Sequence, residues 1–191
     1  MSRVGLAPSV VQELAAWLGD AGAAVESIDL SGCGLTGATR TGNWTVTEWG
    51  RQRAWQKIDS DMDGFIALCA VLGKVRTVRL ADCGLGASSV AELSKIFSDA
   101  DAAVEALAIG ANPIGTEGGN ILIDAIQSSN LKTIDIGKPL PLQGKYESDT
   151  ADLADSGMGP GQVVILAWWL TTDAAAALNA IMLDECLITG T

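Results

Sequence analysis

Two stretches of the chain carry the same pattern, and together they decide the fold. Residues 5–37 read GLAPSVVQELAAWLGDAGAAVESIDLSGCGLTG, and residues 157–190 read GMGPGQVVILAWWLTTDAAAALNAIMLDECLITG, with one residue more. An internal repeat has to be recognised before local structure is assigned, because it determines the architecture of the whole chain. The positions that coincide are Gly5/Gly157, Pro8/Pro160, Trp17/Trp169, Leu18/Leu170, Ile28/Ile181, Leu30/Leu183, Cys33/Cys186 and Gly37/Gly190.

A shorter signature, L-x-L-x-x-C/N-x-L with Ile or Val at several Leu positions, returns between these two copies. Its copies begin at Val78, Leu107 and Ile134, which are 29 and 27 residues apart. A period of this length is typical of leucine-rich repeats. The complete copies are Ile28-Leu30-Cys33-Leu35, Val78-Leu80-Cys83-Leu85, Leu107-Ile109-Asn112-Ile114 and Ile181-Leu183-Cys186-Ile188.

Each part of the signature has a physical reason. The alternation of Ile28 and Leu30 with polar residues predicts a short strand with one buried face. The Cys or Asn that follows can bond to backbone groups where the chain turns away from the sheet. Apolar residues at spacings of three and four then predict helices, and Pro8 and Pro160 suit their first turns. One unit cannot bury its own apolar face, so the units are expected to stack into a parallel-stranded solenoid. The residues expected side by side in adjacent strands are Ile28, Val78, Leu107, Ile134 and Ile181.

Residues 104–137, VEALAIGANPIGTEGGNILIDAIQSSNLKTIDIG, resemble leucine-rich repeats of the ribonuclease-inhibitor-like class, which NOD-like receptors also contain. The resemblance implies an α/β horseshoe with short parallel strands on one side and helices on the other. It also implies a binding scaffold whose partners are set by surface residues. We expect residues 1–191 to form a single domain of this kind, as a fragment of a longer array.

Two segments depart from the repeat. Residues 38–56, ATRTGNWTVTEWGRQRAWQ, interrupt the array, and residues 138–150, KPLPLQGKYESDT, replace a helix with a proline-containing loop. Each is followed by a related phrase, at residues 59–63 and 155–159, that leads into an apolar helix. We interpret the two segments as versions of one irregular repeat.

Charge and residue usage exclude several classes of function. The 191 residues include 12 Lys and Arg against 23 Asp and Glu, for a net charge of −11. Such a field repels phosphate backbones and anionic lipids, so neither nucleic acid nor a membrane surface is expected as a partner. The chain has no histidine, which excludes histidine-dependent catalysis and histidine-ligated metals. A carboxylate-based enzyme would need two acids in one pocket, and the repeat frame places no such pair, so no enzyme activity is expected.

The cysteines and the apolar segments bear on the compartment. Cys33, Cys69, Cys83 and Cys186 lie far apart without C-x-x-C spacing, which predicts reduced thiols rather than a zinc site or a disulfide framework. The opening residues contain no secretory signal. The apolar run at residues 163–183 contains polar breaks and aligns with the first repeat copy, so it is not expected to cross a membrane. We expect a cytoplasmic or other intracellular location.

A basic and aromatic cluster within residues 38–56 is the first candidate binding site. Tryptophan and arginine are the residues most enriched at interaction hot spots, so the cluster is a candidate surface for a protein partner. The structural alternative is that the rings simply cover the convex side of the repeat. The candidate residues are Trp44, Trp49, Arg51, Arg53 and Trp55.

The sequence Asp59-Ser60-Asp61-Met62-Asp63-Gly64-Phe65-Ile66 is the second candidate site. It matches the first eight positions of an EF-hand calcium loop, with Asp59, Asp61 and Asp63 as ligands and Gly64 at the sharp turn. The twelfth position is Ala70 instead of the usual bidentate Glu, so calcium is expected to bind only weakly at this site. No other cofactor is predicted.

The surfaces outside these two segments give three further expectations. The outward positions of the strands are mostly small and include no aromatic residue, so the concave face is plain. Trp17, Trp168 and Trp169 are expected in the core. Exposed terminal units predict self-association through uncapped ends of the solenoid.

These observations favour a non-enzymatic protein-interaction or scaffold module of leucine-rich-repeat type. The alternative is a calcium-responsive binding module that uses residues 59–66.

Overall fold

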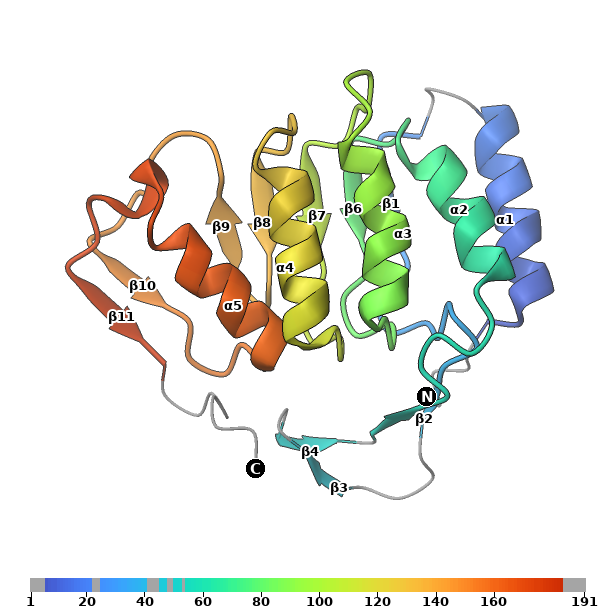
Figure 1. Cartoon of the computed structure of the whole chain (residues 1–191), viewed down its shortest axis with the longest axis horizontal. Helices are drawn as coiled ribbons and strands as arrows, with labels where there is room; N and C mark the ends of the chain where they lie inside the picture. The colour runs from blue at the N-terminus through green and yellow to red at the C-terminus, as the bar shows by residue number, and fades with distance from the viewer. Residues whose placement is uncertain (1–5, 22–24, 41–44, 48–49, 53, 184–191) are drawn as a thin grey trace.

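The computed structural model describes residues 6–21, 25–40, 45–47, 50–52 and 54–183. Along these residues, short strands alternate with helices (Figure 1). The helices are α1 (Pro8–Ala21), α2 (Asp63–Leu72), α3 (Ala87–Phe97), α4 (Gly115–Ile126) and α5 (Pro160–Trp169), with a 3-10 helix η2 (Asp173–Ala175). The strands are β1 (Ser27–Asp29), β2 (Thr39–Arg40), β3 (Thr45–Thr47), β4 (Gly50–Gln52), β5 (Trp55–Gln56), β6 (Thr77–Arg79), β7 (Ala106–Ala108), β8 (Thr133–Asp135), β9 (Pro139–Pro141), β10 (Thr150–Asp152) and β11 (Ala180–Met182).

Five of the strands form one sheet, in the order β1-β6-β7-β8-β9. The first four are parallel, and their central residues Ile28, Val78, Leu107 and Ile134 pair in register. These four side chains are buried, whereas the strand residues on either side of them are half-buried or exposed. The predicted side-by-side arrangement is confirmed at these four positions. The fold is mixed α/β with a mostly parallel sheet.

The prediction that Ile181 lies beside these four residues is wrong. The expectation that all strands run parallel is also wrong. Ile181 lies in β11, which pairs with β10 in a separate two-stranded sheet, opposite Ala151. Strand β9 runs antiparallel to β8, with Leu140 opposite Ile134. The chain reverses at Gly137, whose φ of 124° is a conformation that glycine adopts readily. Strand β9 therefore occupies the edge of β8 at which another parallel strand would pair.

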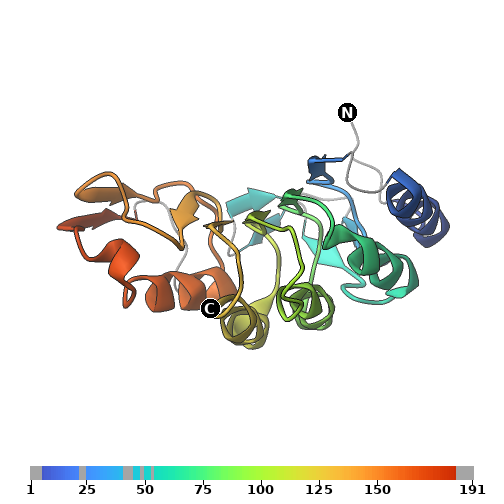
Figure 2. The same cartoon turned by 90° about the horizontal axis from the view of Figure 1, so that it is seen from above.

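Helices α2 to α5 lie in a row along one face of the strands, with α1 beside α2 (Figure 2). Their apolar stripes meet the buried strand residues and form one core, in which Leu93 of α3 and Leu122 of α4 are almost fully buried. Pro8 and Pro160 begin α1 and α5, as predicted. Within the described ranges, no helix combines the length and the apolar character that a membrane crossing requires.

Asn112 joins adjacent units from inside the fold. Its side chain is fully buried at the turn that follows β7. The amide oxygen accepts hydrogen bonds from the backbone N–H groups of Cys83, at 2.8 Å, and Leu85, at 3.1 Å. The amide nitrogen donates to the carbonyl oxygens of Leu80, at 2.7 Å, and Ile109, at 3.0 Å. The role predicted for the Asn position of the signature is therefore confirmed.

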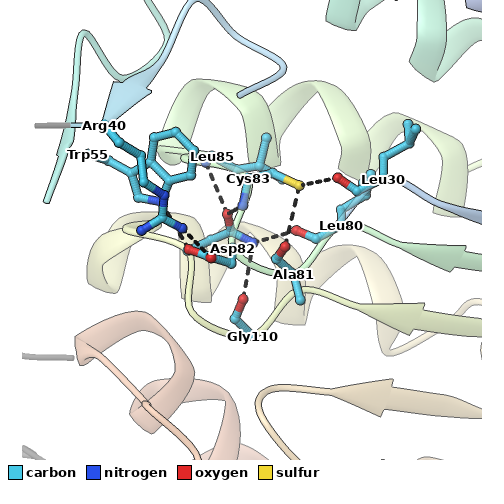
Figure 3. A network of polar contacts seen from close by, with 10 residues as sticks. Leu30, Arg40, Trp55, Leu80, Ala81, Asp82, Cys83, Leu85 and Gly110 are labelled. Carbon is cyan, nitrogen blue, oxygen red and sulfur yellow. Dashed lines mark hydrogen bonds and ion pairs between the residues drawn. The ribbon is translucent and has the colours of Figure 1, made fainter. Parts of the chain in front are cut away.

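Cys83 has the equivalent position in the preceding unit. It is fully buried, and its Sγ donates to the carbonyl oxygen of Leu30 at 3.1 Å (Figure 3). Burial raises the pKa of the Cys83 thiol to about 12. Burial raises the pKa of Cys69 as well. Cys33, Cys69 and Cys83 are all free thiols.

The two tryptophans that share one repeat position have opposite environments. Trp169 is fully buried, its Nε1 donates to the carbonyl oxygen of Pro141 at 2.7 Å, and its ring meets Tyr146 edge to face. Trp17 is 59% exposed, so the prediction that it lies in the core is wrong. The reason is that α1 buries a different face, and no described segment covers Trp17 as Pro141 covers Trp169. Trp168 is half-buried against the core.

Replacing Asn112 should cost more stability than any exposed asparagine can. Asn112→Ala leaves two buried N–H groups and two buried carbonyl oxygens without this partner, so we expect the free energy of unfolding to fall by about 3 kcal/mol or more. Urea unfolding followed by circular dichroism measures the change. Asn120→Ala, on the exposed side of α4, is the control and should change the free energy of unfolding by less than about 0.5 kcal/mol. Equal losses in the two variants would contradict this role of Asn112.

The buried thiols should make the protein less stable at alkaline pH. The pKa of Cys83 is raised in the folded state, so its thiol stays protonated there while the unfolded chain ionises near pH 8.5. The stability that a protonated buried thiol contributes is intact below the pKa of that thiol in the unfolded chain. It is lost as pH rises toward 12, by about 1.4 kcal/mol per pH unit for each such thiol. Urea unfolding between pH 8 and pH 10.5 measures the slope. A Cys69→Ala/Cys83→Ala variant should have a flatter slope, and an unchanged slope would contradict the assignment.

Candidate interaction surfaces

The described parts of residues 38–56 form two antiparallel strand pairs, which we call the ribbon. Strands β2 and β5 pair antiparallel, with Arg40 opposite Trp55, and β3 and β4 form a hairpin with Val46 opposite Arg51. In Figure 1 the ribbon extends from the lower edge of the molecule, below the helices and the main sheet. Sequence reasoning missed these strands, because residues 38–56 lack the repeat signature that marks the strands of the main sheet.

Only one side chain of the predicted basic and aromatic cluster belongs to the described residues. Trp44, Trp49 and Arg53 lie outside them, and Arg51 is described through the backbone of β4 alone. Trp55 is the described member, and it is half-buried. A shared surface made by all five residues therefore remains a prediction.

Trp55 anchors the ribbon to the body of the protein. The guanidinium group of Arg40 lies 4.2 Å from the centroid of the Trp55 ring and forms an ion pair with the carboxylate of Asp82 (Figure 3). Trp55 Nε1 donates to Asp82 Oδ1 at 3.2 Å. The indole packs so closely on Gly84 that a Cβ there would lie 2.8 Å from Trp55 Cδ2. These contacts support the structural alternative for Trp55. Sequence reasoning did not pair Arg40 with Asp82, because nothing in the pattern marks the two residues as partners.

Asp59 binds the N-terminus of a neighbouring helix. Its Oδ1 accepts from the backbone N–H of Gly86 at 3.1 Å, and its Oδ2 accepts from Ser88 at 3.0 Å and Ser89 at 3.2 Å. The Ser89 hydroxyl also donates to Oδ1. Helix α3 lacks a side-chain cap from its own N-cap residue, Gly86. Asp59 therefore satisfies the N–H groups that begin α3 and places negative charge where the helix dipole favours it.

The geometry of residues 59–66 differs from that expected of a calcium loop. The sharp turns lie at Lys57 and Asp59, with φ of 53° and 55°, whereas Gly64 lies inside the first turn of α2. The prediction that Gly64 makes the sharp turn is therefore wrong. A Cβ at Gly64 would lie 2.5 Å from the carbonyl oxygen of Pro8, so glycine is needed here for the close approach of α1 and α2.

The other two acids of the motif remain open to solvent. Asp61 and Asp63 are exposed, and Asp63 is the first residue of α2. Across the described parts of the chain, no group of three or more acids, histidines or cysteines has the arrangement of a metal site. The calcium alternative remains a prediction, with the difference that Asp59 already makes four hydrogen bonds to α3 through its two carboxylate oxygens.

The open face of the main sheet carries a hollow that the sequence analysis did not predict. A shallow depression of about 110 Å³ lies over β6, β7 and β8. Ala106 and Ala108 contribute to its floor, and Arg79 and Asp135 carry its charges. Thr133 and Pro139 also line a larger hollow of about 550 Å³, which continues to the loop at residues 143–148. The residues below the first hollow are those predicted to point outward from the strands.

The wall of the larger hollow comes from the segment that departs from the repeat. Strand β9 turns back beside β8, and the loop after it brings Lys145, Tyr146 and Glu147 to the rim. An aromatic side chain and both signs of charge thus line the hollow that shares Thr133 and Pro139 with the depression over the strands. Sequence reasoning described the strand face as plain because it considered the strand positions alone. The reversal at Gly137, which brings this loop beside the sheet, has no distinct signal in the sequence.

A row of charges precedes the strands. Glu105, just before β7, lies 2.9 Å from Lys132 Nζ and 3.8 Å from Arg76 Nε, which precede β8 and β6. The hydrogen bond from Lys132, together with the positive charges of both bases, lowers the pKa of the Glu105 carboxyl below its usual range. This row links neighbouring strands across the sheet rather than forming part of the hollow.

No protein-family model matches this chain, and no curated protein matches it at a significant level.

Replacing Asp59 should weaken the fold whether or not calcium is present. Asp59→Ala removes charge-assisted hydrogen bonds to the N-terminus of α3, so we expect a loss of about 2 kcal/mol in the free energy of unfolding. Urea unfolding in EDTA measures it. Asp61→Ala, at an exposed acid of the same motif, is the matched control and should have little effect in EDTA.

The same two variants test the calcium alternative. Calorimetric titration with calcium should release heat in the wild type, and less heat in both variants, if the acids act together as ligands. A loss of stability confined to Asp59→Ala, with no calcium heat in any of the three proteins, would leave the helix contact as the role of Asp59.

Proposed function

We propose that this chain is a leucine-rich-repeat solenoid that serves as a non-enzymatic protein-interaction module. The register of Ile28, Val78, Leu107 and Ile134 supports the repeat, because each central strand residue is paired with its counterpart in the next unit. The bonds of Asn112 to the preceding unit support it further. The helices on the opposite face agree with the α/β units of this class.

The hollow on the strand face is the single observation that carries the proposal of a binding site. Ala106 and Ala108 are among its lining residues, and their small side chains let a partner approach the sheet closely. Arg79 and Asp135 provide opposite charges across it, and Tyr146 lies at the rim of the adjoining hollow. Aromatic and arginine side chains around a depression are typical of interaction hot spots. We therefore propose that an extended segment of a protein partner binds along β6, β7 and β8, toward residues 143–148.

The chemistry of the chain supports binding rather than catalysis. Without histidine, the chain lacks the side chain that most often transfers protons near neutral pH. The buried thiols of Cys69 and Cys83 have raised pKa values and are therefore poor nucleophiles. Free buried thiols are also typical of proteins in a reducing compartment, which supports an intracellular location.

The part of the ribbon that contains β3 and β4, at residues 45–52, is a second candidate surface for the same function. The specific observation in its favour is the anchor formed by Arg40, Trp55 and Asp82, which holds the base of the ribbon against the body of the protein. A hairpin fixed at its base can present side chains to a partner at little entropic cost.

Filling the hollow should abolish binding without unfolding the protein. Ala108→Trp places a large side chain on the open side of β7, and we expect recovery of specific partners by affinity capture to fall at least about tenfold. The control is Ala70→Trp, on the exposed side of α2, which should bind like the wild type. Thermal unfolding should show that both variants are folded.

A third variant, with residues 45–52 replaced by a short Gly-Ser turn, separates the two candidate surfaces. If partners are lost only in this variant, the binding site lies on the ribbon rather than on the strand face. An identical set of bound proteins in all variants would contradict both surfaces.

A further inference from the structure

We infer that the groove between α2 and α3 binds a basic amphipathic helix of a partner protein. The groove lies on the helix side of the molecule rather than on the strand face, so the inference goes beyond the function proposed above. Helix α2 has α1 on one side and α3 on the other (Figure 1). Units of the same chain therefore flank the groove on both sides.

Helices α2 and α3 approach each other near both of their ends. At one end, a Cβ on Gly73 would lie 3.6 Å from Ile96 Cγ2. At the other end, the Ser89 hydroxyl donates to Met62 Sδ at 3.8 Å. A hollow of about 290 Å³ lies between the two helices. The helix layer is therefore open between α2 and α3, although it continues on either side.

The two walls of the groove differ in chemistry. Ile66, Ala70 and Gly73 line the α2 side, which is apolar and mostly small. Glu92 and Lys95 line the α3 side, which is charged. A partner that fits both walls needs an apolar side and a charged side.

Helix α2 is apolar on every side, although one side is open to solvent. After its first residue, Asp63, its sequence reads GFIALCAVL, without a charged side chain. A helix that is apolar all round is typically buried all round. Ile66 is nevertheless 44% exposed, and Ala70, one turn later, is exposed as well. The uncovered apolar surface thus lies within the row of helices, where a partner can cover it.

The helices of the described chain carry almost only negative charge. Lys95 is the single base among the residues that the structure assigns to them. Their acids are Glu13, Asp20, Asp63, Glu92, Glu117, Asp124 and Asp173. Asp99, which follows α3, adds a further acid to the lining of the groove. This side of the molecule therefore attracts a basic partner and repels an acidic one.

Glu92 is the acid that a base of the partner can reach from the groove. Its side chain is 19% exposed and forms an ion pair with Lys95, whose side chain is 71% exposed. Burial raises the pKa of the Cys69 thiol, and the negative charge of Glu92 raises it further, which places Glu92 beside the floor of the groove. A lysine or arginine of the partner therefore competes with Lys95 for this carboxylate.

The ends of the two helices add to the same field. Helix α2 ends at Leu72 and α3 at Phe97, and the residues just beyond them, Gly73 and Asp99, both line the groove. The last carbonyl groups of a helix carry the negative end of its dipole. A positive charge of the partner is stabilised at this end of the groove.

The dimensions of the groove suit a short helix. Helix α2 has ten residues and is therefore about 15 Å long, which matches about three turns of a second helix beside it. An amphipathic helix inserts apolar anchors at spacings of three and four, and the small Ala70 and Gly73 let its backbone come close. The hollow is smaller than the about 300–1,000 Å³ typical of small-molecule sites, so side chains of a partner fit it better.

A synthetic peptide tests the inference. The probe is a fluorescein-labelled peptide of about 14 residues, with leucines at spacings of three and four and lysines on the opposite side. Fluorescence anisotropy measures its dissociation constant for the full chain. A peptide of the same composition, with the leucines spread around the helix, should bind at least about tenfold more weakly. A peptide with glutamates in place of the lysines should not bind.

Three variants locate the peptide in the groove. Ala70→Trp fills the groove from the exposed side of α2 and should weaken binding at least about tenfold. Glu92→Gln should weaken binding by about two- to fivefold, because it removes the carboxylate that the peptide reaches. Lys95→Gln should strengthen binding by about the same factor, because it removes the competing base. Circular dichroism checks that all three variants are folded.

Three results would overturn the inference. They are a wild type that does not bind the leucine-lysine peptide at low salt, equal affinity for the two basic peptides, and an Ala70→Trp variant that binds as tightly as the wild type. Ala108→Trp should bind the peptide normally. A partner of the strand face is lost in Ala108→Trp and retained in Ala70→Trp, whereas the peptide behaves in the opposite way. Failure of the groove is thus distinguishable from failure of the strand-face site.

Discussion

Every strand of the main sheet is three residues long, and this shortness is the constraint on which the structure depends. A strand of three residues cannot bury an apolar face or satisfy its backbone groups without neighbouring segments. The neighbours come from the adjacent units, which supply strand hydrogen bonds, the amide of Asn112 and the helix that covers the core. Stability is therefore a property of the contacts between units rather than of any single unit.

The same constraint explains which parts of the fold were predictable. The buried position of each strand follows from local alternation, so the register of Ile28, Val78, Leu107 and Ile134 could be predicted from the spacing of the signature. The direction of β9 could not, because it depends on the positive φ of Gly137, and a glycine in sequence does not reveal its conformation. Ile181 carries the correct pattern, but after the reversal its strand pairs with β10 instead of the main sheet.

Burial of helix residues was less predictable than burial of strand residues. Trp17 and Trp169 occupy one repeat position, and a rule based on residue type alone assigns both to the core. Their difference comes from the neighbours, because Pro141 and Tyr146 contact Trp169 and no described segment has that place beside Trp17. The face that each of these helices buries is decided by the segments that flank it, and the sequence of the helix itself does not contain that information.

The candidate sites follow the same logic, since their most important contacts join segments distant in the chain. Asp59 was read as part of a local motif, yet its carboxylate bonds to residues 86–89 of the next helix. The sequence leaves Trp55 either at a binding surface or as structural cover, and its bond to Asp82 identifies a partner that neither alternative names. In both cases the residue type indicates the chemistry, because an acid accepts hydrogen bonds from N–H groups and an aromatic ring attracts a cation. The partner could be found only in the fold. The hollow beside β9 has the same origin, because the turn at Gly137 that ends the parallel order of strands also brings Tyr146 to the hollow that shares Thr133 and Pro139 with the open face. A departure from the repeat thus creates the surface feature that the regular units lack.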